Sequence, residues 1–196
     1  MRQLRTFLVV AGLLIAAAAP ASAAPPSTDH TTNARAAAAW LGSQLSANGT
    51  VETAPGAVNY SLTIQALIAL ETAGVGGALV DKGLAFVGST VEAYVHAGTT
   101  DDPGALAYVI IAVVLRGQDP TSFGTGATDL VQRLKATERG AADPDAGLFG
   151  ASAPDFDGAY RQGLALLALH ASGATASATA IAWLEDQQCG NGLWLA

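Results

Sequence analysis

Residues 180–194, with the sequence AIAWLEDQQCGNGLW, decide the fold of this chain. They contain the end of an amphipathic helix with a Trp-Leu pair and two glutamines, followed by a glycine turn that ends in Gly-Leu-Trp. Residues 40–51 contain a weaker copy of the same sequence motif, in which the turn ends in valine instead of tryptophan. Self-similarity of this kind predicts a repeated helix-and-turn architecture.

The rest of the chain alternates two kinds of predicted helix. Four helices have a polar face, and three others are apolar and end at a glycine. Corresponding positions of the polar-faced helices recur at intervals of about 46 to 50 residues, which is typical of helical-hairpin repeats. These positions are Trp40, Phe86, Arg133 and Trp183, and the apolar helices end at Gly74, Gly117 and Gly173. The predicted helices cover residues 34–45, 61–72, 79–95, 104–116, 127–137 and 158–171, and a last one leads into the opening stretch.

Two of the apolar helices carry start signals. Ser61 is a candidate N-cap for the helix over residues 61–72. The acidic pair before Pro103 is a stronger signal, because proline suits the first position of a helix. The run ALAYVIIAVVL that follows could also suit a buried strand, but its alternation with clearer helices favours a helix surrounded by protein.

Two arrangements satisfy this alternation. An open α-solenoid leaves both helices of each pair partly exposed, whereas a closed double ring buries one set completely. The apolar set has almost no charge after its first turn, and its many alanines and glycines allow close packing. The pattern therefore favours an all-α fold in which apolar inner helices are surrounded by polar-faced outer helices.

The motif of the opening stretch resembles the QW repeat of the terpenoid cyclase and protein prenyltransferase superfamily of α/α toroids. The matching residues are Trp183, Leu184, Gln188, Gly192 and Trp194. In that superfamily the glutamine ties the helix end to the following turn, and the tryptophan stacks over it. As a whole, the chain resembles exported actinobacterial proteins with prenyltransferase/squalene oxidase repeats, and it is also similar to the α-domains of cobalamin carriers. A complete toroid of this type has about six hairpins, so the resemblance implies an incomplete α/α toroid of repeated helical hairpins over residues 34–196.

The first residues have the features of an export signal. Arg2 and Arg5 precede an apolar run too short to span a bilayer comfortably, and Ala21-Ser22-Ala23 is a small-residue cleavage site. We expect residues 1–23 to be a signal peptide, residues 24–33 to be a flexible leader, and the mature protein to be secreted or at the cell surface, with no stable membrane span. Cleavage removes two basic residues from a chain whose net charge is already −7, and such an acidic chain lacks the basic face that nucleic acids require.

Cys189 is the chain's only cysteine. An unpaired thiol is unusual in an exported protein, and it suggests a disulfide whose partner is absent from this chain. A buried free cysteine is the alternative.

Polar residues gather at the predicted beginning of each inner helix. Because inner helices run parallel in a toroid, these residues should converge at one mouth together with three helix N-termini. The candidate ligand-binding residues are Tyr60, Gln65, Asp102, Asp157, Tyr160 and Arg161. Ser61, Asp102 and Asp157 are also candidate N-caps, and capping is compatible with binding.

Non-catalytic binding of a small ligand or a cell-envelope partner at this mouth is the expected function. One alternative is an isoprenoid-processing enzyme similar to terpene or squalene cyclases, because residues 155–158 (DFDG) resemble their Asp-x-Asp-Asp acid motif. Gly158 stands where the last aspartate belongs, and this departure argues against proton-initiated cyclisation. A structural repeat module of a larger surface protein is the third possibility.

No cofactor or metal set is predicted. The three histidines, His30, His96 and His170, lie in the leader, an outer helix and an inner helix, and Cys189 lies on an outer turn. This scatter does not resemble a zinc site.

Overall fold

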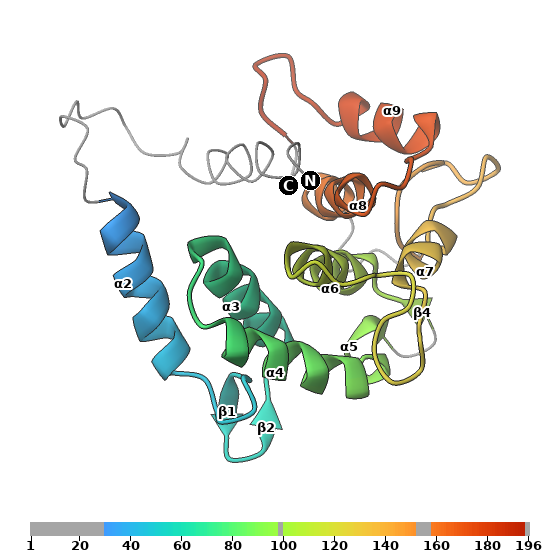
Figure 1. The fold of residues 1–196 in the computed structure, drawn as a ribbon. Coiled ribbons are helices and arrows are strands. Elements are labelled where there is room, and N and C mark those ends of the chain that lie inside the picture. Colours follow the sequence, from blue (N-terminus) through green and yellow to red (C-terminus); the bar gives the residue numbers. More distant parts are fainter. Residues whose placement is uncertain (1–29, 98–99, 152–157, 195–196) are drawn as a thin grey trace.

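The structure is a computed structural model that describes residues 30–97, 100–151 and 158–194 (Figure 1). This part of the chain is mostly helical, and its strands form only two short antiparallel hairpins, β1 with β2 and β3 with β4. The predicted all-α class is therefore confirmed. The helices are α2 (His30–Ser43), α3 (Tyr60–Ala73), α4 (Gly77–Ser89), α5 (Glu92–Val95), α6 (Pro103–Leu115), α7 (Leu130–Ala136), α8 (Ala159–Ala171) and α9 (Ala178–Asp186). The strands are β1 (Glu52–Ala54), β2 (Ala57–Val58), β3 (His96–Ala97) and β4 (Thr100–Asp101).

The helices follow one another round an arc, with α2 at one end and α8 and α9 at the other (Figure 1). Helix α6 packs against both α3 and α8. Helices α2 and α4 pack against α3, whereas α7 packs against α6 and α9 against α8. Helix α6 thus lies between the other two apolar helices, and the polar-faced helices flank all three, in the alternation that the sequence predicted.

Helix α6 is the most deeply buried of the three inner helices. Leu106, Val109, Ile110 and Val113 are completely buried, and so is Ala107 between them. These side chains point in several directions around the helix, so α6 needs protein on more than one side. Burying each large aliphatic side chain is worth about 1.5–3 kcal/mol, and α3 and α8 together provide the surfaces that make this burial possible.

The predicted start and stop signals are correct at some boundaries and wrong at others. Asp102 caps α6 by accepting the N–H groups of residues 104 and 105 through one oxygen, at 2.8 and 3.0 Å, and Pro103 is the first residue of the helix. Gly74 ends α3 in the left-handed conformation, also as predicted. The N-cap of α3 is Asn59 and not Ser61, because the Asn59 amide oxygen accepts the Leu62 N–H at 3.0 Å and so satisfies the first turn.

The outer helices differ from their predicted lengths. The segment predicted as one helix over residues 79–95 breaks into α4 and α5, because the Ser89 and Thr90 hydroxyls both bond to the Phe86 carbonyl and compete with the helical ladder. Helix α7 begins only at Leu130, after a turn in which Ala127 has φ 48°. Helix α2 begins at His30, inside the range expected to be a leader.

Gln162, on α8, is completely buried and connects three segments. Its side-chain oxygen accepts the Phe149 N–H at 2.9 Å, and its amide nitrogen donates to the carbonyls of Gly147 and Ala180 at 2.9 and 2.8 Å. The loop before α8 and the beginning of α9 are therefore fastened to one side chain. These bonds favour one arrangement of the loop, α8 and α9, because leaving any of the buried N–H or C=O groups without a partner would cost free energy.

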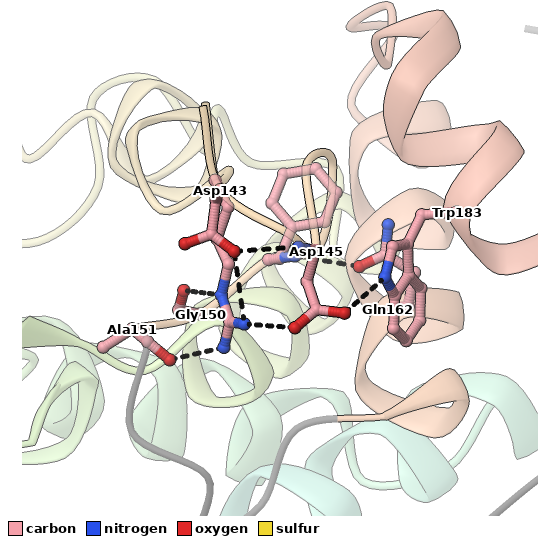
Figure 2. Close-up of polar contacts among 8 residues, drawn as sticks. Asp143, Asp145, Gly150, Ala151, Gln162 and Trp183 are labelled. Carbon is pink, nitrogen blue, oxygen red and sulfur yellow. Dashed lines mark hydrogen bonds and ion pairs between the residues drawn. The ribbon is translucent and has the colours of Figure 1, made fainter. Parts of the chain in front are cut away.

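Arg139 fastens the other end of the same loop (Figure 2). Its guanidinium donates to the carbonyls of Gly150 and Ala151 at 3.0 and 2.6 Å and to the Asp145 carboxylate at 3.2 Å. Asp145 also accepts the indole N–H of Trp183 at 3.5 Å, so the loop reaches α9 by a second route. Charge-assisted bonds of this kind hold a long loop without requiring regular secondary structure.

We predict that Gln162→Met destabilises the protein by about 2–4 kcal/mol, because methionine fills the space but leaves one buried N–H and two buried carbonyls without a partner. The matched control is Gln132→Met on the exposed face of α7, which should change stability by less than about 0.5 kcal/mol. Urea unfolding of both variants measures the difference. Equal stabilities would contradict the role given to Gln162.

We also predict that Gly147→Ala is more destabilising than Gly192→Ala. Both glycines have positive φ, 91° and 81°, so alanine is strained at either position by about 1–2 kcal/mol. Only at Gly147 would the new Cβ also lie 2.5 Å from the Thr179 carbonyl on α9, whereas it would meet no atom within 4 Å at Gly192. The clash should add about 1–3 kcal/mol, and thermal unfolding of the two variants would reveal it as a larger fall in Tm for Gly147→Ala.

Candidate functional site

The N-terminal ends of α3, α6 and α8 are joined by side-chain contacts. Arg161 on α8 lies 3.4 Å from the Asp102 carboxylate at the start of α6. The hydroxyls of Tyr160 on α8 and Tyr108 on α6 lie 2.5 Å apart. Residues from the beginnings of α6 and α8 therefore meet, as the parallel arrangement of inner helices predicted.

The beginning of α3 joins this group through α5. The Tyr60 ring stacks on the Tyr94 ring with 5.6 Å between centroids and 18° between planes, and on the Phe86 ring at 6.2 Å and 29°. The Tyr94 hydroxyl lies 3.3 Å from the Ser61 hydroxyl and is close enough to Asp102 and Arg161 for both charges to act on it. We refer to Tyr60, Ser61, Tyr94, Asp102, Tyr108, Tyr160 and Arg161 as the tyrosine cluster.

The tyrosine cluster contains all four tyrosines of the protein. They come from α3, α5, α6 and α8, and they are separated by long stretches of sequence. Stacked aromatic pairs contribute about 0.5–1.5 kcal/mol beyond the area they bury, so part of the cluster stabilises the fold. Tyr160, in contrast, is 70% exposed and is available to a molecule from solvent.

The phenols of Tyr94 and Tyr108 stay protonated at neutral pH, because the pKa of each is raised. Burial is the main cause that raises the pKa of Tyr94, and the Asp102 charge adds to it, whereas the Ser61 hydroxyl and Arg161 act in the opposite direction. The pKa of Tyr108 is also raised, first by burial and then by its hydrogen bond with Tyr160. The cluster therefore offers phenolic O–H groups as hydrogen-bond donors and acceptors.

Asp102 both caps α6 and contacts Arg161 in the tyrosine cluster. Its Oδ1 accepts the two backbone N–H groups that cap α6, while its Oδ2 faces the Arg161 guanidinium. Capping and membership of the cluster use different oxygens. Gly104 leaves room for the Arg161 side chain beside Asp102. A Cβ at position 104 would lie 3.4 Å from the Arg161 Nε.

The structure brings together four of the six predicted binding residues. Tyr60, Asp102, Tyr160 and Arg161 lie in the tyrosine cluster. Gln65 is exposed on α3 and makes no described hydrogen bond with the cluster. Asp157 lies outside the described residues.

Sequence reasoning missed Tyr94 and Tyr108 as cluster members. Tyr94 was hidden because residues 79–95 read as one continuous helix, whereas the break after Ser89 turns α5 toward the inner helices. Tyr108 stands in the apolar run of α6 and reads as a core residue. A signal was available, because a tyrosine stands just before or within the first two turns of every predicted inner helix.

An ion-pair network supports the segment that carries Tyr94. The Arg133 guanidinium on α7 binds both oxygens of Asp101 at 2.8 and 2.6 Å and the Glu92 carboxylate at 2.5 Å. The His96 ring also lies 3.0 Å from Asp101. These contacts hold α5 and the β3–β4 hairpin against α7. The Arg133 guanidinium, bonded to Asp101, is the main cause that lowers the pKa of this carboxyl, and the His96 ring adds to it.

Two hollows lie away from the cluster. One of about 410 Å³ is lined by the end of α4 and by residues 125–128, and another of about 450 Å³ lies between the end of α8 and Ile181. Both are wide open to solvent and contain none of the cluster residues. The tyrosine cluster is the better-supported site because its charged and hydrogen-bonding groups converge from separate elements.

The described residues contain no group of three or more His, Cys, Asp or Glu side chains arranged to hold a metal ion. Within the same residues, no helix has the length and apolar character needed to cross a membrane. Cys189 is half-buried at the start of the turn that follows α9.

The chain matches no protein-family model, and neither the curated proteins nor the solved structures compared with it give a significant match.

We predict that the stabilising effect of Asp101 depends on pH. Its pKa is lower in the folded protein than in the unfolded chain, so its contribution is present above about pH 4 and is lost as the pH falls through the lower folded value. Asp101→Asn should cost about 1 kcal/mol at pH 7 and much less at pH 2–3. Urea unfolding at both pH values tests this, with the exposed Asp186→Asn on α9 as control. A loss for Asp101→Asn that does not shrink in acid would contradict the ion-pair explanation.

Proposed function

We propose that this protein is a non-catalytic binding protein and that the tyrosine cluster is its binding site for a small ligand or a cell-envelope component. The observation that carries the proposal is the convergence of all four tyrosines with the Asp102–Arg161 pair. Exposed aromatic rings beside paired charges are common in recognition sites, because aromatic side chains supply a large contact area at a low cost in conformational entropy. Tyr160 supplies such an exposed ring here.

The chemistry of the cluster favours binding over catalysis. The Tyr94 and Tyr108 phenols have raised pKa values and do not serve as bases at neutral pH. The Asp102 carboxylate is occupied by the α6 cap and by Arg161. A site of ring faces and phenolic hydroxyls suits a ligand that has an apolar ring face edged with oxygens, such as a neutral sugar residue.

The rest of the proposal concerns architecture and location. We propose that the hairpins form part of an α/α toroid, which the contacts of α6 with α3 and α8 support. In such an arrangement the parallel inner helices direct three N-terminal ends to the same mouth. We further propose that the protein is secreted or held at the cell surface, on the basis of the export signal at residues 1–23.

We predict that neutral sugars bind at the tyrosine cluster. Titration of ¹⁵N-labelled protein with neutral hexoses, pentoses and N-acetylhexosamines should shift amide signals around Tyr94, Tyr108 and Tyr160. Tyr160→Ala should weaken that binding about threefold to tenfold, since it removes a ring that the fold leaves exposed. Trp40→Ala is the matched control, because Trp40 is a similarly exposed aromatic residue on α2.

Two results would contradict the binding proposal. One is the absence of clustered shifts with every sugar tested, or shifts that Tyr160→Ala leaves unchanged. The other is turnover of an isoprenoid substrate that Asp157→Asn abolishes in a folded protein, which would favour the cyclase-like alternative. A binder should instead show graded affinity changes on substitution.

A further inference from the structure

Within the described ranges of the chain, three turns share one backbone pattern. They occupy residues 46–51 after α2, residues 139–149 around the loop after α7, and residues 189–194 after α9. In each turn the first N–H donates to the carbonyl of the penultimate residue, and a glycine with positive φ stands just before that residue. The donor–acceptor pairs are Ser46 with Thr50 at 2.8 Å, Arg139 with Leu148 at 2.9 Å, and Cys189 with Leu193 at 2.7 Å.

The first two turns are closed by the inner helix that follows them. The Val51 N–H donates to the Thr63 hydroxyl on α3 at 2.9 Å. The Phe149 N–H donates to the Gln162 side chain on α8, also at 2.9 Å. Thr63 and Gln162 are each the fourth residue of their helix, and both are completely buried. The same position of two inner helices thus provides an acceptor for the last N–H of the preceding turn.

The third turn is open. Trp194 is 46% exposed and Leu193 is 65% exposed, whereas their counterparts Phe149 and Leu148 are 0% and 3% exposed. In the part of the chain that the structure describes, no group accepts the Trp194 N–H. The turn therefore has the backbone of the two closed turns without the helix that closes them.

We propose that residues 189–194, together with the adjoining flank of α8 and α9, form the docking surface for one further helix of the inner type. The partner is an apolar helix whose fourth residue carries an amide or hydroxyl, and it would lie beside α8 as α8 lies beside α6. Helices α8 and α9 also expose Leu167 (43%) and Ile181 (44%), so apolar surface extends beyond the turn. Recognition of an apolar helix face by such a surface is a common mode of binding.

A second copy of the chain fits this surface less well. The first helix that the structure describes, α2, is of the outer type, and over residues 31–43 it is mostly exposed and has no buried polar side chain. Docking α2 would place two outer-type helices in succession and would leave the Trp194 N–H without an acceptor. The repeated pattern calls for an inner helix at this position.

The test uses a capped peptide with the sequence of residues 158–173, which is an inner helix with glutamine as its fourth helical residue. Added to the whole protein carrying Trp40→Phe and Trp183→Phe, it should shift the fluorescence of Trp194 to shorter wavelength as the indole becomes buried. The same peptide with Gln162→Leu should bind about tenfold more weakly, because it lacks the acceptor. Leu193→Asp in the protein should abolish the shift.

A second measurement does not depend on the tryptophan substitutions. In the wild-type protein, saturating peptide should slow hydrogen exchange of the Trp194 amide, and the Gln162→Leu peptide should not. The proposal is overturned if neither signal changes, or if the two peptides act equally. It is also overturned if Trp194 becomes buried with rising protein concentration in the absence of peptide, since a second copy would then cover the surface.

Discussion

The burial of most of α6 is the constraint on which the rest of the structure depends. A helix with apolar side chains on every side is stable only when other elements cover it, and no single neighbour can do so. Helices α3 and α8 provide two of those surfaces, and both run beside α6. Each of them then has apolar surface of its own that an outer helix must cover, which explains the positions of α2, α4 and α9. The alternation of helices along the chain is thus a consequence of one buried helix at its centre.

Much of this could be predicted from the sequence because the signals are local. The Asp-Pro start of α6 and the glycine that ends α3 specify backbone geometry within a few residues, and both predictions are correct. The break between α4 and α5 was not predicted, because apolar periodicity continues through Ser89 and Thr90. It arises from competition between hydroxyl groups and the helical ladder, which a periodicity argument does not register.

The burial of Gln162 was harder to predict from the sequence. This residue stands in a polar run, Tyr160-Arg161-Gln162, and a polar run at a helix start usually indicates solvent exposure. The helical period nevertheless places Gln162 in line with Ala165 and Leu169, which are both buried, so the sequence did hold evidence of its position. The glutamine emphasised by the repeat motif, Gln188, bonds to the carbonyl of Gly192 at 3.1 Å from an exposed position. The motif therefore identifies the turn, while the buried contact that closes the preceding turn comes from the inner helix.

The tyrosine cluster could be predicted only in part, because it depends on how separate elements meet. Asp102, Tyr160 and Arg161 lie at helix starts, where parallel packing brings them together, and this much follows from topology. Tyr94 joins them because Arg133 binds Asp101 and Glu92 and holds α5 against α7, which itself packs against α6. An outer helix thus determines the position of an aromatic residue at the mouth of the inner ones. The arrangement of side chains in the cluster consequently depends on outer-helix residues that do not contact it. Substitutions at Arg133 should therefore change the cluster by moving Tyr94.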